Sequence, residues 1–128
     1  KGRTAITPER IAVNLKDSTS PDNIGVIYHN ESIVKGGENA YFTSLDIDMI
    51  VTNLENIDIP VKISNTAGLY VCNNIFYHTM DYINSKKLNI KAGFVHFPQM
   101  ESDSKSKVFV LPIEKQYQAL LEIIKKHL

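Results

Sequence analysis

Cys72 and His96 are the two residues whose chemistry first suggests a function for this sequence. Cys72 is the chain's only cysteine, and it stands directly before a helical pattern, where backbone N–H groups and the helix dipole favour an anion such as a thiolate. An imidazole next to a thiolate can protonate a leaving group. Cys72 and His96 are therefore candidates for a nucleophile and its acid–base partner.

Each of these residues also has a plainer interpretation. A lone cysteine is commonly a small, buried and unreactive side chain. A histidine near the end of a strand often does no more than complete a local hydrogen bond. The two residue types alone leave both interpretations open, so the surrounding sequence has to decide between them.

The segments around Cys72 and His96 predict a strand–helix–strand unit. Val61–Ser64 contains β-branched residues, and the apolar run Ile90–Phe97 carries His96, so each predicts a strand. A helix is predicted between them because side chains recur at helical spacing, at Ile75, Phe76, Thr79, Met80 and Ile83. Strands joined in this way run parallel, and ligands bind at the carboxyl edge of such sheets. We therefore expect Cys72 and His96 at one edge of the sheet.

The residues before this unit predict short strands and one helix. Alternating apolar residues predict a strand at 11–15, and a second short strand is expected at 40–43, with loops and a hairpin over 16–37. A helix begins after Ser44 or Asp46, either of which can cap it. The side chains expected to face the core are Ile47, Ile50, Val51 and Leu54.

The tail of the sequence predicts a polar loop and a final helix. Residues 102–107 (SDSKSK) are expected to form a solvated loop rather than a flap over the site. Pro112 opens the helix, and the apolar stripe expected to pack on a sheet is Ile113, Tyr117, Leu120, Leu121 and Ile124. Together the elements predict an α/β protein, a three-layer α/β/α domain with a mostly parallel, twisted sheet.

Composition excludes several classes of function. The 128 residues hold 14 basic and 14 acidic side chains, so no net charge attracts nucleic acid or a membrane surface. A single cysteine allows no internal disulfide and suits a reducing compartment. No apolar run approaches the roughly 18 residues of a membrane span. We expect a cytoplasmic protein without a secretion signal, and no metal or other cofactor, because the histidines and the cysteine show no ligand spacing such as H-E-x-x-H.

Three stretches carry a resemblance to a known family. RTAITPERIAVN, at 3–14, resembles the glutamate signature of the pyroglutamyl peptidase I family, also called pyrrolidone-carboxylate peptidases. SNTAGLYVCNN, at 64–74, is similar to the family's cysteine signature, and FVHFP, at 94–98, to the strand that carries its histidine. Without this resemblance, Glu9 would be predicted to be a solvated surface acid. The signatures occur in the family's order and spacing.

The resemblance implies a role for each matching residue. Cys72 corresponds to the nucleophile, His96 to the general base and acid, and Glu9 to the carboxylate that orients the histidine. Tyr70 and Val71 correspond to part of the wall of the substrate pocket. The implied reaction is hydrolysis of the amide bond after an N-terminal pyroglutamyl residue of a peptide, without a metal. The family also forms homo-oligomers, commonly tetramers, so a homo-oligomer is expected.

The sequence departs from the family in two places, and these leave alternatives open. The family begins with a strand and a G-F-x-P-F-G loop that have no counterpart here, and it commonly has Arg-Ile where this chain has Thr19-Ser20. We therefore expect residues 1–128 to form a single peptidase domain that lacks its N-terminal portion. One alternative is an inactive fragment or relative that acts as a structural or oligomerising partner. The other is a different cysteine amidohydrolase.

Overall fold

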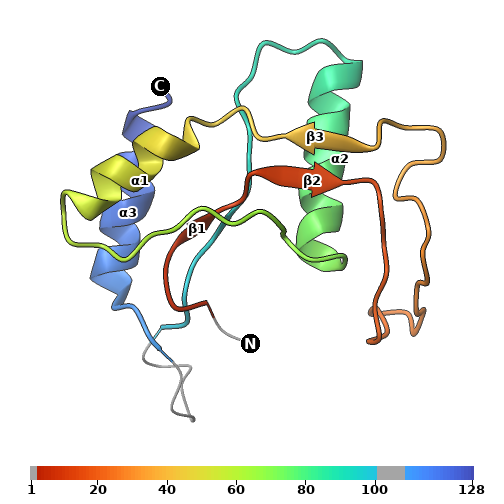
Figure 1. The fold of residues 1–128 in the computed structure, drawn as a ribbon, viewed down its shortest axis with the longest axis horizontal. Coiled ribbons are helices and arrows are strands. Elements are labelled where there is room, and N and C mark those ends of the chain that lie inside the picture. The colour runs from red at the N-terminus through yellow and green to blue at the C-terminus, as the bar shows by residue number, and fades with distance from the viewer. Residues whose placement is uncertain (1–2, 101–108) are drawn as a thin grey trace. The chain divides into compact units, whose positions relative to one another are not determined.

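The computed structural model describes residues 3–100 and 109–128, so the loop predicted at 102–107 lies outside the described residues. The elements, in chain order, are β1 (Thr7–Pro8), β2 (Ile11–Val13), β3 (Ala40–Phe42), α1 (Ile47–Glu55), α2 (Val71–Ser85), β4 (Val95–His96) and α3 (Ile113–Lys125) (Figure 1). They belong to two compact units. The first unit comprises the described parts of 1–9, 45–64 and 95–128, and the second comprises 10–44 and 65–94.

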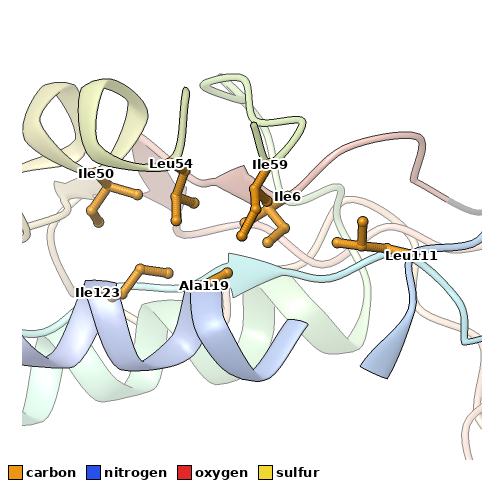
Figure 2. Packing of buried hydrophobic residues seen from close by; sticks show 7 residues of the cluster. All are labelled: Ile6, Ile50, Leu54, Ile59, Leu111, Ala119 and Ile123. Carbon is orange, nitrogen blue, oxygen red and sulfur yellow. The ribbon is translucent and has the colours of Figure 1, made fainter. Parts of the chain in front are cut away.

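The first unit is built around a core between α1 and α3. Figure 2 shows side chains from both helices converging on one layer, with Ile50 and Leu54 on α1 and Ala119 and Ile123 on α3. Three further buried side chains complete the cluster, namely Ile6, Ile59 and Leu111. Burial of these apolar side chains is the main contribution that stabilises the unit.

Helix α1 is positioned as the sequence predicts. Asp46 is its N-cap, and the Asp46 side chain accepts a hydrogen bond from the backbone N–H of Met49 over 2.9 Å. Of the four residues predicted to face the core, three are buried and Val51 is half-buried; the buried ones are Ile47, Ile50 and Leu54. The cap and the apolar spacing therefore determine both the start and the inward face of this helix.

Helix α3 begins after Pro112, as predicted, but its buried face differs from the predicted stripe. Its buried residues are Ala119 and Ile123, whereas four residues of the predicted stripe are exposed, namely Ile113, Tyr117, Leu120 and Ile124. Ala119 carries only a methyl group, so α3 can approach α1 most closely along the Ala119 row. Close packing against α1 therefore prevails over the larger apolar stripe, which is left on the surface.

The strands of the first unit correct the predicted parallel strand pair. β1 and β4 are antiparallel, with Thr7 opposite His96. On its other edge the β1 segment pairs with 61–64 through parallel bridges from Ile6 to Val61 and from Glu9 to Ser64. The segments at 61–64 and 95–96 therefore run in opposite directions, so the parallel strand–helix–strand unit predicted from them is wrong. Apolar runs indicate strands, but they do not identify the partner, and here both segments pair with a strand from early in the chain.

The second unit packs α2 against a two-stranded antiparallel ribbon. β2 pairs with β3 so that Ile11 lies opposite Phe42 and Val13 opposite Ala40. The buried cluster of this unit is Ala12, Ala67, Phe76, Tyr77 and Met80. Of the residues that recur at helical spacing, Phe76 and Met80 are buried and Ile75 is exposed, while Tyr77, outside that set, is fully buried. The Tyr77 hydroxyl donates a 2.6 Å hydrogen bond to the Glu38 carbonyl, which satisfies its polar end inside the core.

The loop between β2 and β3 contains an antiparallel bridge, in agreement with the hairpin predicted at 16–37. Lys16 and Glu31 form an antiparallel bridge, with each backbone N–H donating to the other residue's carbonyl.

Across the described residues, no helix has both the length and the apolar character needed to span a membrane.

Candidate active site

Glu9 and His96 meet in the first unit through the pairing of β1 with β4. Glu9 directly follows β1, and His96 is the last residue of β4. Glu9 Oε1 lies 2.6 Å from His96 Nδ1, and the Glu9 side chain is 0% exposed while that of His96 is 20% exposed. The local pattern around Glu9 suggests a surface acid, which is wrong, because the whole segment 5–9 is buried. Glu9 and His96 form a carboxylate–imidazole pair in which the carboxylate is fully buried and the imidazole is partly exposed.

This pair determines which ring nitrogen can act as a base. An ionised carboxylate can only accept hydrogen bonds. At 2.6 Å from the carboxylate oxygen, Nδ1 of His96 therefore carries the hydrogen and donates it. In the neutral imidazole, Nε2 then keeps its lone pair. This is the tautomer that a general base needs, with a carboxylate fixing the ring as in other hydrolytic triads.

Arg3 is a third member of this cluster, and the sequence interpretation gave it no role. The Nη2 atom of Arg3 donates to Glu9 Oε1 over 3.0 Å and lies 3.3 Å from His96 Nδ1. The other carboxylate oxygen of Glu9, Oε2, is buried and has no hydrogen-bond partner among the described residues. No signal in the sequence marked Arg3, because its contact with Glu9 depends on the bend at residues 4 and 5.

Cys72 lies in the second unit, at the start of α2. It is the second residue of the helix and a free, half-buried thiol packed against the second unit's core. Tyr70 is the N-cap residue but makes no side-chain capping hydrogen bond. Tyr70 therefore leaves the first backbone N–H groups of α2 uncapped, and such groups attract negative charge. The positive φ of 81° at Gly68 allows the turn that leads into this helix start.

Asn73, which the sequence interpretation also missed, fixes the start of α2 to β2. Its side-chain oxygen accepts from the N–H of Val13 over 3.0 Å, and its amide group donates to the carbonyls of Val13 and Leu15 over 2.9 and 3.1 Å. Asn73 is also buried. These three hydrogen bonds make Asn73 an anchor that holds the start of α2 against the β2 segment. Asn73 directly follows Cys72 in the chain. The sequence does not distinguish Asn73 from its neighbour Asn74, so only the contacts with β2 identify it.

Tyr70 and Val71 border two hollows in the second unit. One has a volume of about 370 Å³ and is lined by Asp17, Ser18, Thr19, Ser20 and Tyr70. The other has a volume of about 100 Å³, and its lining is Lys16, Asp22, Tyr28, Tyr70, Val71 and Asn74. The Tyr70 hydroxyl donates to the carbonyl of Pro21 over 2.7 Å, which holds the ring against the loop. Both residues predicted to bind substrate therefore line a concave surface next to Cys72 in the chain.

Asp22 organises the loop that lines these hollows. Its carboxylate accepts from the backbone N–H groups of Ile24 and Val26 and from the Tyr28 hydroxyl, each over 2.9 Å. The Val26 N–H is the main reason why the pKa of Asp22 lies below its usual value, and the other hydrogen bonds add to it. The loop is thus held by an ionised carboxylate at neutral pH.

The structure brings together some of the predicted site residues and leaves the others in a separate unit. Glu9 and His96 are in hydrogen-bond contact in the first unit, whereas Tyr70, Val71 and Cys72 belong to the second. The proximity of Cys72 to His96 therefore stays a prediction. Within the described ranges 3–100 and 109–128, no group of histidine, cysteine and acidic residues could hold a metal ion.

Comparison with known proteins identifies the family. The family model described as pyroglutamyl peptidase matches residues 1–126. The chain belongs to the pyroglutamyl peptidase family. This confirms the resemblance inferred from the three signature stretches.

Curated relatives in the pyroglutamyl peptidase family agree over much of the chain. A pyrrolidone-carboxylate peptidase of Thermosipho africanus is 42% identical over 126 residues, covering 97% of this chain and 62% of the relative. One of Aliivibrio fischeri is 47% identical over 103 residues, covering 80% of this chain and 48% of the relative. The chain thus spans about half to three fifths of the length of these relatives.

Solved structures of the pyroglutamyl peptidase family show the same fold. Pyroglutamyl peptidase I from Bacillus amyloliquefaciens matches with a TM-score of 0.93 at 37% identity, covering 98% of this chain and 60% of that one. Pyrrolidone carboxyl peptidase from Thermococcus litoralis matches with a TM-score of 0.93 at 30% identity and the same coverage of 98% and 60%. These matches confirm the predicted α/β fold class.

Proposed function

We propose that this chain supplies the catalytic residues of a cysteine peptidase that hydrolyses the amide bond after an N-terminal pyroglutamyl residue. The observation that carries the proposal is the 2.6 Å contact between the buried Glu9 carboxylate and His96 Nδ1. Such a contact equips Nε2 of the ring for proton transfer. Membership of the pyroglutamyl peptidase family supports the choice of substrate.

The first half-reaction forms an acyl-enzyme. In this proposal His96 accepts the proton of the Cys72 thiol, and the thiolate attacks the carbonyl carbon that joins the pyroglutamyl ring to the next residue. The C–N bond then breaks, and the departing amine takes the proton from the His96 imidazolium. A thioester between the pyroglutamyl group and Cys72 remains. Glu9 stabilises the imidazolium that forms along the way.

The second half-reaction releases the product. His96 removes a proton from water as the water attacks the thioester carbon, and the same proton passes to the departing Cys72 sulfur. The uncapped N–H groups at the start of α2 are suited to stabilise the negative oxygen in both half-reactions, which supports this placement of the oxyanion donors.

The same proposal names the substrate, the residues that would contact it, and the assembly and location of the protein. Peptides with an N-terminal pyroglutamyl residue are the partners we propose, and Tyr70 and Val71 would contact the lactam ring, which the concave surface beside them supports. We further propose a single peptidase domain that forms homo-oligomers in the cytoplasm. The lone cysteine, which suits a reducing compartment, supports the location.

A panel of three naphthylamide substrates tests the proposal. Pyroglutamyl-naphthylamide should be cleaved, whereas the glutaminyl and prolyl analogues should not, because burying their charged amino group in a pocket for a neutral lactam costs several kcal/mol. Fluorescence of released naphthylamine measures all three rates. Similar cleavage of the three compounds would favour the alternative of another cysteine amidohydrolase. Cleavage of none of them would favour a structural or oligomerising partner.

A further inference from the structure

Arg3 and His96 compete for the same carboxylate oxygen. The Nη2 atom of Arg3 and the Nδ1 atom of His96 lie 3.0 Å and 2.6 Å from Glu9 Oε1. The second oxygen, Oε2, is buried without a hydrogen-bond partner among the described residues. Within residues 3–100 and 109–128, the polar contacts of this buried carboxylate therefore converge on one atom, and Arg3 supplies one of its two donors.

The geometry decides which of the Arg3 contacts is a hydrogen bond. Nδ1 of His96 gives its hydrogen to Glu9, so it has no lone pair available for Arg3, and the 3.3 Å separation of Nη2 and Nδ1 brings two donors together. The hydrogen bond of Arg3 is therefore the one to Glu9. Arg3 influences the imidazole through the carboxylate and not by binding it directly.

The charges of the cluster make Arg3 the natural counterion of Glu9. The Glu9 side chain is fully buried, whereas 32% of the Arg3 side chain remains exposed. A buried carboxylate without a counterion is strongly unfavourable. With Arg3 present and His96 neutral, the three groups carry no net charge. Arg3 thus balances the charge of the buried carboxylate and holds Oε1 in place as the acceptor of the Nδ1 hydrogen.

We propose that Arg3 is a positioning residue that holds the Glu9 carboxylate in place, so that His96 keeps its hydrogen on Nδ1 and the lone pair on Nε2. The inference rests on the proposed function for its catalytic consequence. Its structural part concerns the Arg3–Glu9–His96 cluster alone and can be observed without turnover.

Proton NMR of the chain gives the first readout. A nitrogen-bound proton in a short hydrogen bond to a carboxylate resonates far downfield, and the spectrum of a His96→Gln variant assigns that signal to His96. We expect the signal in the wild type, its loss or broadening in Arg3→Met, and its recovery in Arg3→Lys, which restores a cation. Arg10→Met is the matched control, because Arg10 is exposed and bonds to Asn65 instead. It should keep the signal.

Steady-state kinetics on pyroglutamyl-naphthylamide give the second readout. Arg3→Met should lower kcat about tenfold and change KM less than twofold, with partial recovery in Arg3→Lys, while circular dichroism melting shows each variant folded. A downfield signal and a kcat that both survive in Arg3→Met would overturn the inference. So would a wild type that lacks the signal. Wild-type inactivity with the expected pattern of signals would refute the proposed function and leave the role of Arg3 in the cluster supported.

Discussion

At the scale of single residues, the proposed chemistry divides between two reactive groups and the groups that support them, which are Glu9, Arg3 and Asn73. Cys72 and His96 stand out because few residue types perform nucleophilic chemistry. Glu9 is recognised only through the family resemblance, since nothing in its local pattern distinguishes a buried carboxylate from a surface one. Arg3 and Asn73 were missed because their roles depend on contacts made only in the folded chain, between Arg3 and Glu9 and between Asn73 and the backbone of Val13.

Replacement of Cys72 tests directly whether this residue is the nucleophile. Cys72→Ser should reduce release of pyroglutamate by about a thousandfold or more, because a serine hydroxyl is a far poorer nucleophile without a base tuned to it. The melting temperature should change by only a few degrees, since the side chain is half-buried and the exchange nearly isosteric.

Chemical labelling complements this variant. Iodoacetamide should modify Cys72 rapidly near neutral pH in the wild type, and mass spectrometry should find no adduct in Cys72→Ser. Wild-type turnover in the serine variant would refute the assignment. Slow labelling of the wild type would instead indicate a structural thiol.

At the scale of elements, helices were predicted more accurately than strand partners. α1 starts at Asp46, one of its two predicted caps, and α3 after its predicted proline, because capping and proline geometry are local properties. The partners of β1 and β4 depend on residues about 90 positions apart, as the pairing of Thr7 with His96 shows. The buried face of α3 likewise depends on α1, so its own periodicity could not reveal it.

The attachment of α2 to β2 provides a prediction at this scale. Asn73→Ala should lower the free energy of unfolding by about 2–4 kcal/mol, because it leaves buried backbone groups of Val13 and Leu15 without their partners. Chemical denaturation followed by circular dichroism measures the change. Asn74→Ala is the matched control and should stay within about 0.5 kcal/mol of the wild type. Equal stability of both variants would show that Asn73 is no anchor.

At the scale of the whole molecule, the division into two units could not be read from the sequence. The chain passes between the units at Glu9–Arg10, Ser44–Leu45, Ser64–Asn65 and Phe94–Val95. None of these points has the composition of a linker, because each unit is assembled from separate segments of the chain. The expected single domain thus stays a prediction, and Glu9 and His96 both lie within two residues of a crossing point.

The exposed stripe of α3 supports the predicted self-association. Ile113, Tyr117, Leu120 and Ile124 are 53%, 60%, 44% and 45% exposed. Part of the stripe lines a hollow of about 280 Å³ formed by Phe97, Ile113, Gln116, Tyr117 and Leu120. An apolar helix face beside a hollow can be self-complementary, as a two-fold interface requires, and a chain without net charge does not repel its own copies. We therefore predict that a second copy of the chain covers this face.

A pair of charge substitutions on α3 tests this prediction. Leu120→Glu would place a carboxylate in the apolar contact, where its desolvation costs several kcal/mol, so the mass from light scattering should fall towards that of the monomer. Gln118→Glu adds the same charge at an exposed position outside the stripe and should leave the mass unchanged. Because Leu120 is 44% exposed, its substitution should affect folding little. A monomeric wild type, or equal association of both variants, would contradict self-association through α3.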